Sequence, residues 1–453
     1  MEKIIPRNYR GTRDWRAGEV MLRQNIINVA TKVFQEFGFE ALETPVIELR
    51  EILQGKYGEE GNSLTYFFRK SGEEIGLRYD HTVPLARVVA QYGNELVMPY
   101  RRYAIGPVFR ADTPQKGRYR QFTQLDYDVI GVSSPIADAE VVTISYTVLS
   151  RLGFTDFEIQ IFDRNLLNGM AQFIGASTKD EILAVLRSWD KIEKASREQI
   201  AEELDKAGCS IALIQKFNKV TDSLLNLNES NEKTLAKLGE IFLGQQNAEK
   251  GIDTLTKIIA YLSGFGVPSE ACRINPTLAR GLDYYTGPIF ETIVKKAGVG
   301  SITGGGRFDN LIETLGGPSI PGTGSSFGLE RLISVMETLG IATSSNTSVQ
   351  VFVTVFDPKN QRFVEKSLSV ATILRKLGYN TEIYMDNGRL GKQFQLADSR
   401  GASLVIVIGP DEIEKGLLTI KDLRTGKGGS KTNQIQVPES TFTQKVGELL
   451  TIK

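Results

Sequence analysis

Residues 100–132 are the most informative segment for the fold of this chain, because they contain a basic turn between two extended arms. The segment includes the text IGPVFR, then ADTPQKGRY, then RQFTQLDYDVIGV. Both arms alternate apolar and polar residues, as half-buried strands do, and the text between them contains the proline and glycine that are typical of turns. This order predicts a long antiparallel hairpin, and with it an antiparallel sheet.

One face of the second arm has side chains that could bind a ligand. Alternation places Arg120, Phe122, Gln124, Asp126 and Asp128 together on that face. Such a face could bind a planar, phosphorylated ligand, with the guanidinium on phosphate, the ring against a base and a carboxylate on an amine. The same pattern also fits an ordinary solvated sheet face, and this arm alone leaves both interpretations open.

The turn is strongly basic although the chain as a whole is neutral. Lys and Arg total 54, as do Asp and Glu, so no overall field draws the chain toward nucleic acid or anionic lipid. Basic residues are nevertheless concentrated here, against the single acid Asp112: Arg101, Arg102, Arg110, Lys116, Arg118 and Arg120. A local polyphosphate or nucleic-acid site is one interpretation, and pairing with acidic residues elsewhere is the other.

The scarcity of histidine and cysteine, together with the absence of several motifs, excludes some functional classes. One histidine, His81, and two separated cysteines, Cys209 and Cys272, cannot assemble a zinc site of the usual kind. The G-x-S-x-G string at residues 324–328 lacks the histidine that should follow it in a hydrolase, and no Walker loop occurs. No run reaches the roughly 18 apolar residues of a membrane helix. We therefore expect a cytoplasmic protein with no membrane partner.

The chain is long enough for several hydrophobic cores. Apolar spacing predicts a helix over residues 21–37, followed by a strand over 39–49 in which Pro45 indicates an edge, a strand end or an interface. Helical periodicity dominates the middle of the chain, glycine-rich extended text returns after it, and a β-α-β-α-β pattern ends the sequence. The expected division is residues 1–166 and 265–340 as one α+β domain, 167–264 as a helical insertion, 341–348 as a linker and 349–453 as an α/β domain.

Three further segments combine glycine with polar or aromatic residues. LARGLDYYTGPIFE at residues 278–291 indicates a ligand-binding wall, and GGGRFD and GTGSSFGLER follow at 304–309 and 322–331. Glycine lets the backbone approach a ligand closely. Each segment alone also fits an ordinary turn between strands, and a buried Arg331 could be a structural ion pair.

Taken in order, these segments resemble the histidyl-tRNA synthetase family, a class II aminoacyl-tRNA synthetase family. Residues 37–48 resemble the dimer-forming first motif of the class, FRADTPQKGRYRQFTQLDYDVIG the second and GTGSSFGLER the third. ARGLDYYTGPIFE is similar to the signature of the histidine-specific family. The resemblance implies a six-stranded antiparallel catalytic sheet with a helical insertion, a homodimer, and an anticodon-binding domain at residues 349–453.

The implied activity is ATP-dependent conversion of L-histidine to histidyl-adenylate, with transfer to the 3′ end of tRNA(His). For ATP, the resemblance implies Arg110 on the α-phosphate, Phe122 stacked on adenine, and Arg118 and Arg331 on the outer phosphates. It also implies Arg280 as the catalytic arginine beside Arg110. Mg²⁺ is expected with ATP; acidic residues near the third motif are candidate ligands, and the sequence does not choose among them.

For the amino acid, the resemblance implies Asp80 and Thr82 at the α-amino group, with Gln124 nearby, and Asp128 with Tyr284 and Tyr285 at the imidazole. Arg110 and Arg280 would also contact the amino acid. The tip of the basic turn would meet tRNA through Gln115 and Lys116.

Two residues depart from the family pattern. His81 takes the place of a residue that is usually apolar or small, and we interpret it as a neighbour of the site with no catalytic role. Phe308 stands where many members carry tyrosine. Two other functions share the fold: a histidine-sensing regulatory subunit of ATP phosphoribosyltransferase, and a plain nucleic-acid-binding module. Such regulatory subunits generally lack the C-terminal domain and parts of the catalytic signature, and a binding module would not need an intact amino-acid site.

Overall fold

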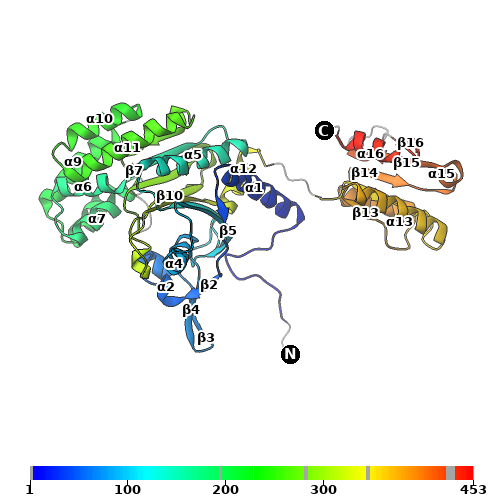
Figure 1. Cartoon of the computed structure of the whole chain (residues 1–453), viewed down its shortest axis with the longest axis horizontal. Coiled ribbons are helices and arrows are strands. Elements are labelled where there is room, and N and C mark those ends of the chain that lie inside the picture. Colours follow the sequence, from blue (N-terminus) through cyan, green and yellow to red (C-terminus); the bar gives the residue numbers. More distant parts are fainter. Residues whose placement is uncertain are drawn as a thin grey trace. The chain divides into compact units, whose positions relative to one another are not determined.

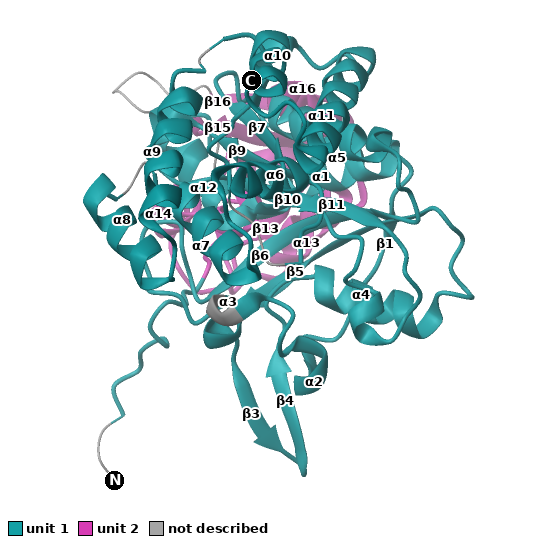
Figure 2. Cartoon of the chain, turned by 90° about the vertical axis from the view of Figure 1, so that its left-hand side faces the viewer, with its two compact units in different colours: residues 1–14, 23–342 teal, residues 15–22, 343–453 magenta. Residues whose placement is uncertain are grey.

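The computed structural model describes residues 4–192, 195–227, 229–279, 284–342, 347–424 and 434–451. The chain divides into two compact units, which Figure 2 colours separately: residues 1–14 with 23–342, and residues 15–22 with 343–453. Each unit is described by itself below.

An eight-stranded sheet forms the centre of the first unit (Figure 1). Its central six strands are antiparallel, as expected, and one short parallel strand extends each edge. The strands run, from edge to edge, β1 (Glu40–Ala41), β5 (Tyr100–Phe109), β6 (Gln121–Ile130), β11 (Gly322–Gly328), β10 (Thr303–Arg307), β9 (Pro288–Ile293), β7 (Glu158–Asp163) and β8 (Cys272–Ile274).

The predicted hairpin is present as β5 and β6. Its register pairs Tyr100 with Ile130 and Phe109 with Gln121. One face of β6 packs into the core, where the Tyr127 ring stacks 5.0 Å from Phe34 of α1 (Ala17–Glu36) and its hydroxyl lies 2.5 Å from Ser145 Oγ of α5 (Pro135–Arg151). The other face therefore carries the even-numbered polar residues that alternation had grouped.

The single strand predicted over residues 39–49 is wrong. The segment forms two short strands in different sheets, β1 and β2 (Ile47–Leu49), with Pro45 in the loop between them. Proline cannot donate a hydrogen bond to a ladder, so the strand ends there and the chain changes sheets. β2 is the edge of a three-stranded sheet with β4 (Glu73–Leu77) and β3 (Phe67–Lys70).

Three helices lie close to the small sheet in the sequence, and the candidate site begins at the last of them. They are α2 (Arg50–Leu53), α3 (Gly58–Leu64) and α4 (Thr82–Tyr92), while α12 (Leu329–Leu339) follows β11 directly. A hydrophobic cluster beneath α4 joins Tyr79 and Val83 to Phe308. This cluster fixes the beginning of α4 against the end of β10.

Six consecutive helices occupy the middle of the sequence, as its periodicity predicts. They lie together in Figure 1, with α11 packed on both α6 and α10. They are α6 (Arg164–Ile174), α7 (Lys179–Asp190), α8 (Arg197–Lys206), α9 (Ile211–Leu225), α10 (Asn231–Ile241) and α11 (Gln246–Gly264).

The second unit contains a five-stranded sheet with its own hydrophobic core. Its order is β13 (Thr381–Ile383), β12 (Val351–Val353), β14 (Leu404–Val407), β15 (Leu417–Asp422) and β16 (Gln434–Pro438). The first three strands are parallel and the last two antiparallel. The helices are α13 (Gln361–Lys376), α14 (Leu390–Ser399), α15 (Pro410–Lys415) and α16 (Phe442–Thr451). The predicted β-α-β-α-β pattern is confirmed over the first three strands.

Candidate active site

Asp80 anchors one end of the site at the start of α4. Its Oδ1 accepts hydrogen bonds from the backbone N–H groups of Thr82 and Val83, at 3.1 and 3.0 Å, and from the Tyr57 hydroxyl at 3.2 Å. Its Oδ2 accepts from the Tyr284 hydroxyl at 3.1 Å. Burial raises the pKa of Asp80, and these hydrogen bonds oppose the rise. The carboxylate is thus buried but held by four donors.

Asp128 lies between two neighbouring strands. On one side its Oδ2 is 2.8 Å from Nη2 of Arg102, its direct partner on β5. On the other side it faces Gly324 of β11, where a Cβ atom would lie 2.1 Å from Asp128 Oδ1. Burial raises the pKa of Asp128 to about 6, although the charge of Arg102 opposes the rise. A carboxylate in this setting can accept a hydrogen bond from a ring N–H.

Arg110 follows β5 and lies between two aromatic rings. Its guanidinium carbon is 4.1 Å from the centroid of Tyr79 and 5.2 Å from that of Phe122, and its Nε donates to the Tyr79 carbonyl at 3.1 Å. Cation–π contacts of this kind orient a guanidinium without neutralising it. The positive charge of Arg110 therefore stays available to an anionic ligand beside Phe122.

Arg118 and Arg331 bring further positive charge to the same region. Burial, and then the charges of Arg118 and Arg110, lower the pKa of Arg331, so the three guanidinium groups are electrostatic neighbours. Arg331 Nη1 donates to the Ser301 carbonyl at 2.6 Å, and Arg118 lies 3.2 Å from Asp112. Like charges gathered in this way favour binding of a polyphosphate, which would relieve their repulsion.

The other predicted contact residues differ in where they lie. Gln124 donates through Nε2 to Ser326 Oγ at 3.3 Å, and its buried Oε1 has no hydrogen-bond partner within the described residues. Gln115 and Lys116 are exposed at the tip of the basic turn. Arg280 lies outside the described residues, so its role stays a prediction.

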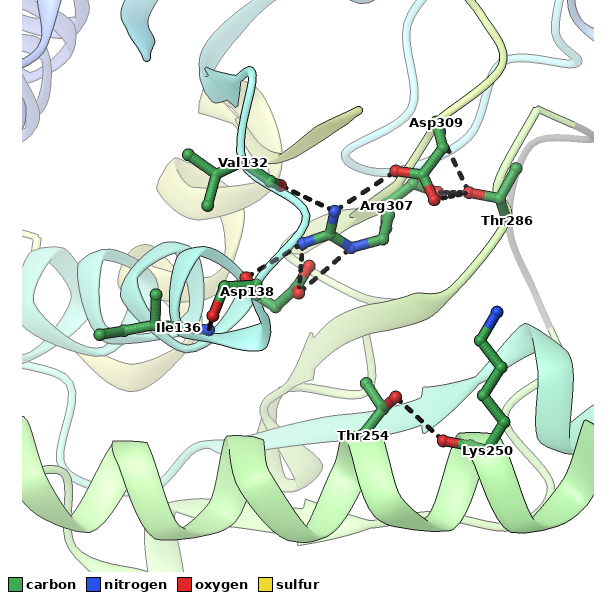
Figure 3. A network of polar contacts seen from close by, with 9 residues as sticks. Val132, Ile136, Asp138, Lys250, Thr254, Thr286, Arg307 and Asp309 are labelled. Carbon is green, nitrogen blue, oxygen red and sulfur yellow. Dashed lines mark hydrogen bonds and ion pairs between the residues drawn. The ribbon is translucent and has the colours of Figure 1, made fainter. Parts of the chain in front are cut away.

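A buried network holds the strand that follows the histidine-type signature (Figure 3). Arg307 Nη2 lies 2.6 Å from Asp138 Oδ2, and Arg307 Nη1 donates to Asp309 Oδ1 at 3.3 Å. The Thr286 hydroxyl donates to Asp309 Oδ2 at 3.0 Å. Thr286 follows Tyr284 and Tyr285, whose rings meet edge to face 5.0 Å apart. The network therefore fixes the base of the segment that carries both tyrosines.

The acidic residues near the third motif differ in their fit to a metal ion. Glu330 accepts from Arg23 at 2.7 Å and from the Thr123 N–H at 2.9 Å, so both of its oxygens are engaged. Glu291 lies close enough to Arg331 to affect its pKa. Within the described ranges, no three Asp, Glu, His or Cys residues are grouped as a metal site. This donor set fits Mg²⁺ held mainly by nucleotide phosphates with one or two carboxylates.

The sequence matches the family model described as histidyl-tRNA synthetase over residues 11–332. The chain belongs to the histidyl-tRNA synthetase family. Residues 350–448 match an anticodon binding domain. The chain is 37% identical to a histidine–tRNA ligase of Gloeobacter violaceus, with 96% of this chain and 97% of that protein covered, and 39% identical to one of Rhodopirellula baltica, with 93% and 94% covered.

A solved histidyl-tRNA synthetase from Nostoc sp. PCC 7120 has the same fold, with a TM-score of 0.84, 30% identity, and 98% of this chain and 100% of that chain covered. The chain is thus a class II synthetase with a C-terminal anticodon-binding domain, and its enzyme class is ligase. Across the part of the chain that the structure describes, no helix has the length and apolar character to cross a membrane.

The two departures from the family pattern are both buried. His81 Nε2 lies 3.2 Å from the Gly106 carbonyl, and burial, followed by the charges of Arg78 and Arg102, lowers the pKa of His81 to about 3. Its ring is therefore neutral at physiological pH. The Phe308 ring packs edge to face 6.0 Å from Tyr284.

Two residues of the candidate site, Arg102 and Tyr57, were not predicted from the sequence. Arg102 was counted only among the basic residues of the hairpin, yet it is buried against Asp128. Its even spacing from Arg110 along the first arm could have placed it on the ligand face, had alternation been applied to both arms. No pattern in the sequence indicated Tyr57, because its contact with Asp80 depends on the tertiary fold around the small sheet.

Proposed function

We propose that this chain activates L-histidine with ATP at the face of β6 that carries Phe122, Gln124 and Asp128, and then charges tRNA(His). The supporting observation is that two buried carboxylates, Asp80 and Asp128, lie on the same side of the sheet as the arginine group. Histidyl-adenylate is an amino acid joined to a nucleotide. The acidic residues at one end of the site would bind its amino group and imidazole, and the arginines at the other end would bind its phosphate.

In the proposed first step, the histidine carboxylate attacks the α-phosphorus of ATP and pyrophosphate leaves. The carboxylate is already ionised, so no protein base is required, and catalysis rests on alignment and on charge stabilisation at the phosphoryl oxygens. Arg110 and Arg280 would stabilise the reacting phosphate, Arg118 and Arg331 the departing pyrophosphate, and Phe122 would stack on adenine. In the second step, a hydroxyl of the terminal adenosine of tRNA attacks the adenylate carbonyl and AMP leaves.

The amino acid would be held at both ends. Asp80 would accept from the α-amino group, with Thr82 and Gln124 beside it, and Asp128 would accept from the imidazole N–H. Burial, and then the charges of Asp80 and Asp128, raise the pKa of Tyr285, so this tyrosine is an electrostatic neighbour of Asp128. Tyr284 donates to Asp80, so it would act on the amino group through that carboxylate as well as lining the imidazole site.

Further parts of the assignment rest on family membership. Mg²⁺ would bind through ATP phosphates with Glu291 as the candidate protein ligand, and would neutralise phosphate charge. The protein would act as a cytoplasmic homodimer, with Gln115 and Lys116 touching tRNA. We also propose the domain division given above, with residues 167–264 as an insertion and 349–453 as the anticodon-binding domain.

Amino-acid-dependent exchange of labelled pyrophosphate into ATP tests the proposal. The purified full-length protein should exchange with histidine and not with the other standard amino acids, since Asp128 requires a ring N–H at a fixed position. Absence of exchange with histidine, while a control synthetase works in the same assay, would contradict the proposal and favour a histidine-sensing regulatory protein. That alternative is less supported, because curated histidine–tRNA ligases match nearly the whole chain.

A further inference from the structure

Arg102 is the only arginine of the hairpin's basic group that is completely buried within the described structure. It lies on β5 directly opposite Asp128, with Nη2 2.8 Å from Asp128 Oδ2. The same nitrogen donates to the backbone carbonyl of His81 at 3.0 Å. One side-chain nitrogen thus connects Asp128 on β6 with the start of α4, where Asp80 and Thr82 lie.

Two carboxylates, Asp126 and Asp128, lie close to this guanidinium, and the charge of a third, Asp80, acts on both of them. Asp126 and Asp128 share a face of β6, and the charges of Asp80 and Asp128 both raise the pKa of Asp126. For Asp126 and Asp128 alike, Arg102 is the main influence that opposes the effect of burial. Without a positive charge at this position, buried carboxylates so close together would take up protons.

The hydrogen bonding of Arg102 is incomplete for a purely structural ion pair. Within the described residues, its Nε and Nη1 are buried and have no hydrogen-bond partner, and neither has Oδ1 of Asp126. Oδ2 of Asp128 also accepts no hydrogen bond there, so its contact with Arg102 is an ion pair. A buried charge pair stabilises a fold only when its geometry and remaining hydrogen bonds are satisfied, and apolar side chains often serve better. Because two of its donor nitrogens have no partner, a contribution to the stability of the fold does not explain an arginine at this position.

We propose that Arg102 is a positioning residue for the amino-acid site, which holds the Asp128 carboxylate ionised and oriented toward the imidazole of the substrate. This inference rests on the proposed function and extends it by one residue. On the other side, Gly324 leaves room for the Asp128 side chain, because a Cβ there would lie 2.1 Å from Oδ1. Arg102 acts through Asp128 and does not touch the substrate.

Arg102→Met, which removes the charge and keeps much of the side-chain length, tests the proposal in the pyrophosphate-exchange assay. The KM for histidine should rise about 30-fold or more, as expected when one partner of a buried charge pair is lost. The KM for ATP should stay within about twofold, because the ATP arginines are separate. Arg102→Lys should fall between these values, because lysine keeps the charge but lacks the planar fork.

Arg101→Met is the matched control. Arg101 is the next residue on the same strand, points to the opposite face, and pairs with Glu140 of α5 at 3.2 Å. It should leave the KM for histidine within about twofold, as expected when a partly exposed ion pair is removed. An Arg102→Met enzyme with an unchanged KM for histidine, or with KM values for histidine and ATP raised equally, would overturn the proposal.

A double-mutant cycle separates action through Asp128 from any other effect. Asp128→Asn and the double variant Arg102→Met/Asp128→Asn should have nearly equal KM values for histidine, because Arg102 has nothing left to position. Fully additive losses would overturn the proposal. If Arg102→Met fails to fold, Arg102→Lys decides the question, and an unchanged KM there overturns it. A wild-type protein without histidine exchange would instead overturn the proposed function, and this inference with it.

Discussion

Among single residues, Gly324 explains why glycines are clustered at residues 322–331 of the candidate active site. The sequence indicated only that backbone approaches something closely at residues 322–331. In the structure that partner is a carboxylate of the protein itself, since a Cβ at Gly324 would lie 2.1 Å from Asp128 Oδ1. Such a distance requires Asp128 to move, and the same Cβ would also lie 2.7 Å from the backbone carbonyl oxygen of Tyr127.

Gly324→Ala should therefore weaken histidine binding. Displacing Asp128 costs about 1–3 kcal/mol by analogy with other overpacked sites, which corresponds to a KM for histidine raised roughly 5- to 150-fold in pyrophosphate exchange. Gly239→Ala in α10 is the control, because a Cβ there meets no atom within 4 Å. Equal KM values for the two variants would contradict the tight placement of Asp128.

At the scale of elements, the network around Arg307 joins β10 to the start of α5. Arg307 donates to Asp138 of α5 and to the Val132 carbonyl at 2.9 Å, and Asp138 is completely buried (Figure 3). Burial raises the pKa of Asp138, and Arg307 is the main opposing influence. The charge of Arg307 therefore permits an ionised aspartate beneath the segment that carries Tyr284 and Tyr285.

Arg307→Met should lower the free energy of unfolding of the first unit by about 3–5 kcal/mol, because Asp138 would remain buried without its partner. Urea denaturation, followed by the fluorescence of the buried Trp189, measures the change. Arg50→Met is the control: Arg50 pairs with Glu74 at the exposed surface, and its loss should cost about 0–1 kcal/mol. A cost for Arg307→Met no larger than for Arg50→Met would show that the network is not a stabilising link.

At the scale of the whole molecule, the two units have separate hydrophobic cores. The core of the second unit is built from residues between 349 and 450, and the cluster beside the amino-acid site is built from residues between 42 and 320. Neither cluster takes a residue from the other's range. Under the proposed function, amino-acid activation would belong to the first unit and part of tRNA recognition to the second.

Deleting residues 349–453 should leave histidine-dependent pyrophosphate exchange largely intact. Charging of tRNA(His) should fall at least about tenfold, the effect of losing about 1.4 kcal/mol of tRNA binding. Both rates are measured on the same preparation, with circular dichroism to check that the remaining chain is folded. Undiminished charging would contradict the assignment of this unit to anticodon binding.

Local elements and the order of the motifs could be predicted without the structure. Alternation in residues 121–130 specified which residues share a face with Phe122. Helical spacing predicted a helix over residues 21–37 and helices over 167–264, where the structure has α1 and the helices from α6 to α11. These features follow from the geometry of one segment, a period of two in strands and 3.6 in helices, so neighbouring residues are sufficient to reveal them.

The contacts between groups that are distant in the sequence could not be predicted in this way. Tyr284 reaches Asp80 across 204 residues of chain, and Arg102 opposes Asp128 because of the strand register. Pro45 likewise lies between two short strands, β1 and β2, that belong to different sheets. The physical reason is that strand order, register and the closeness of two backbones depend on the packing of the whole unit, which no local period encodes.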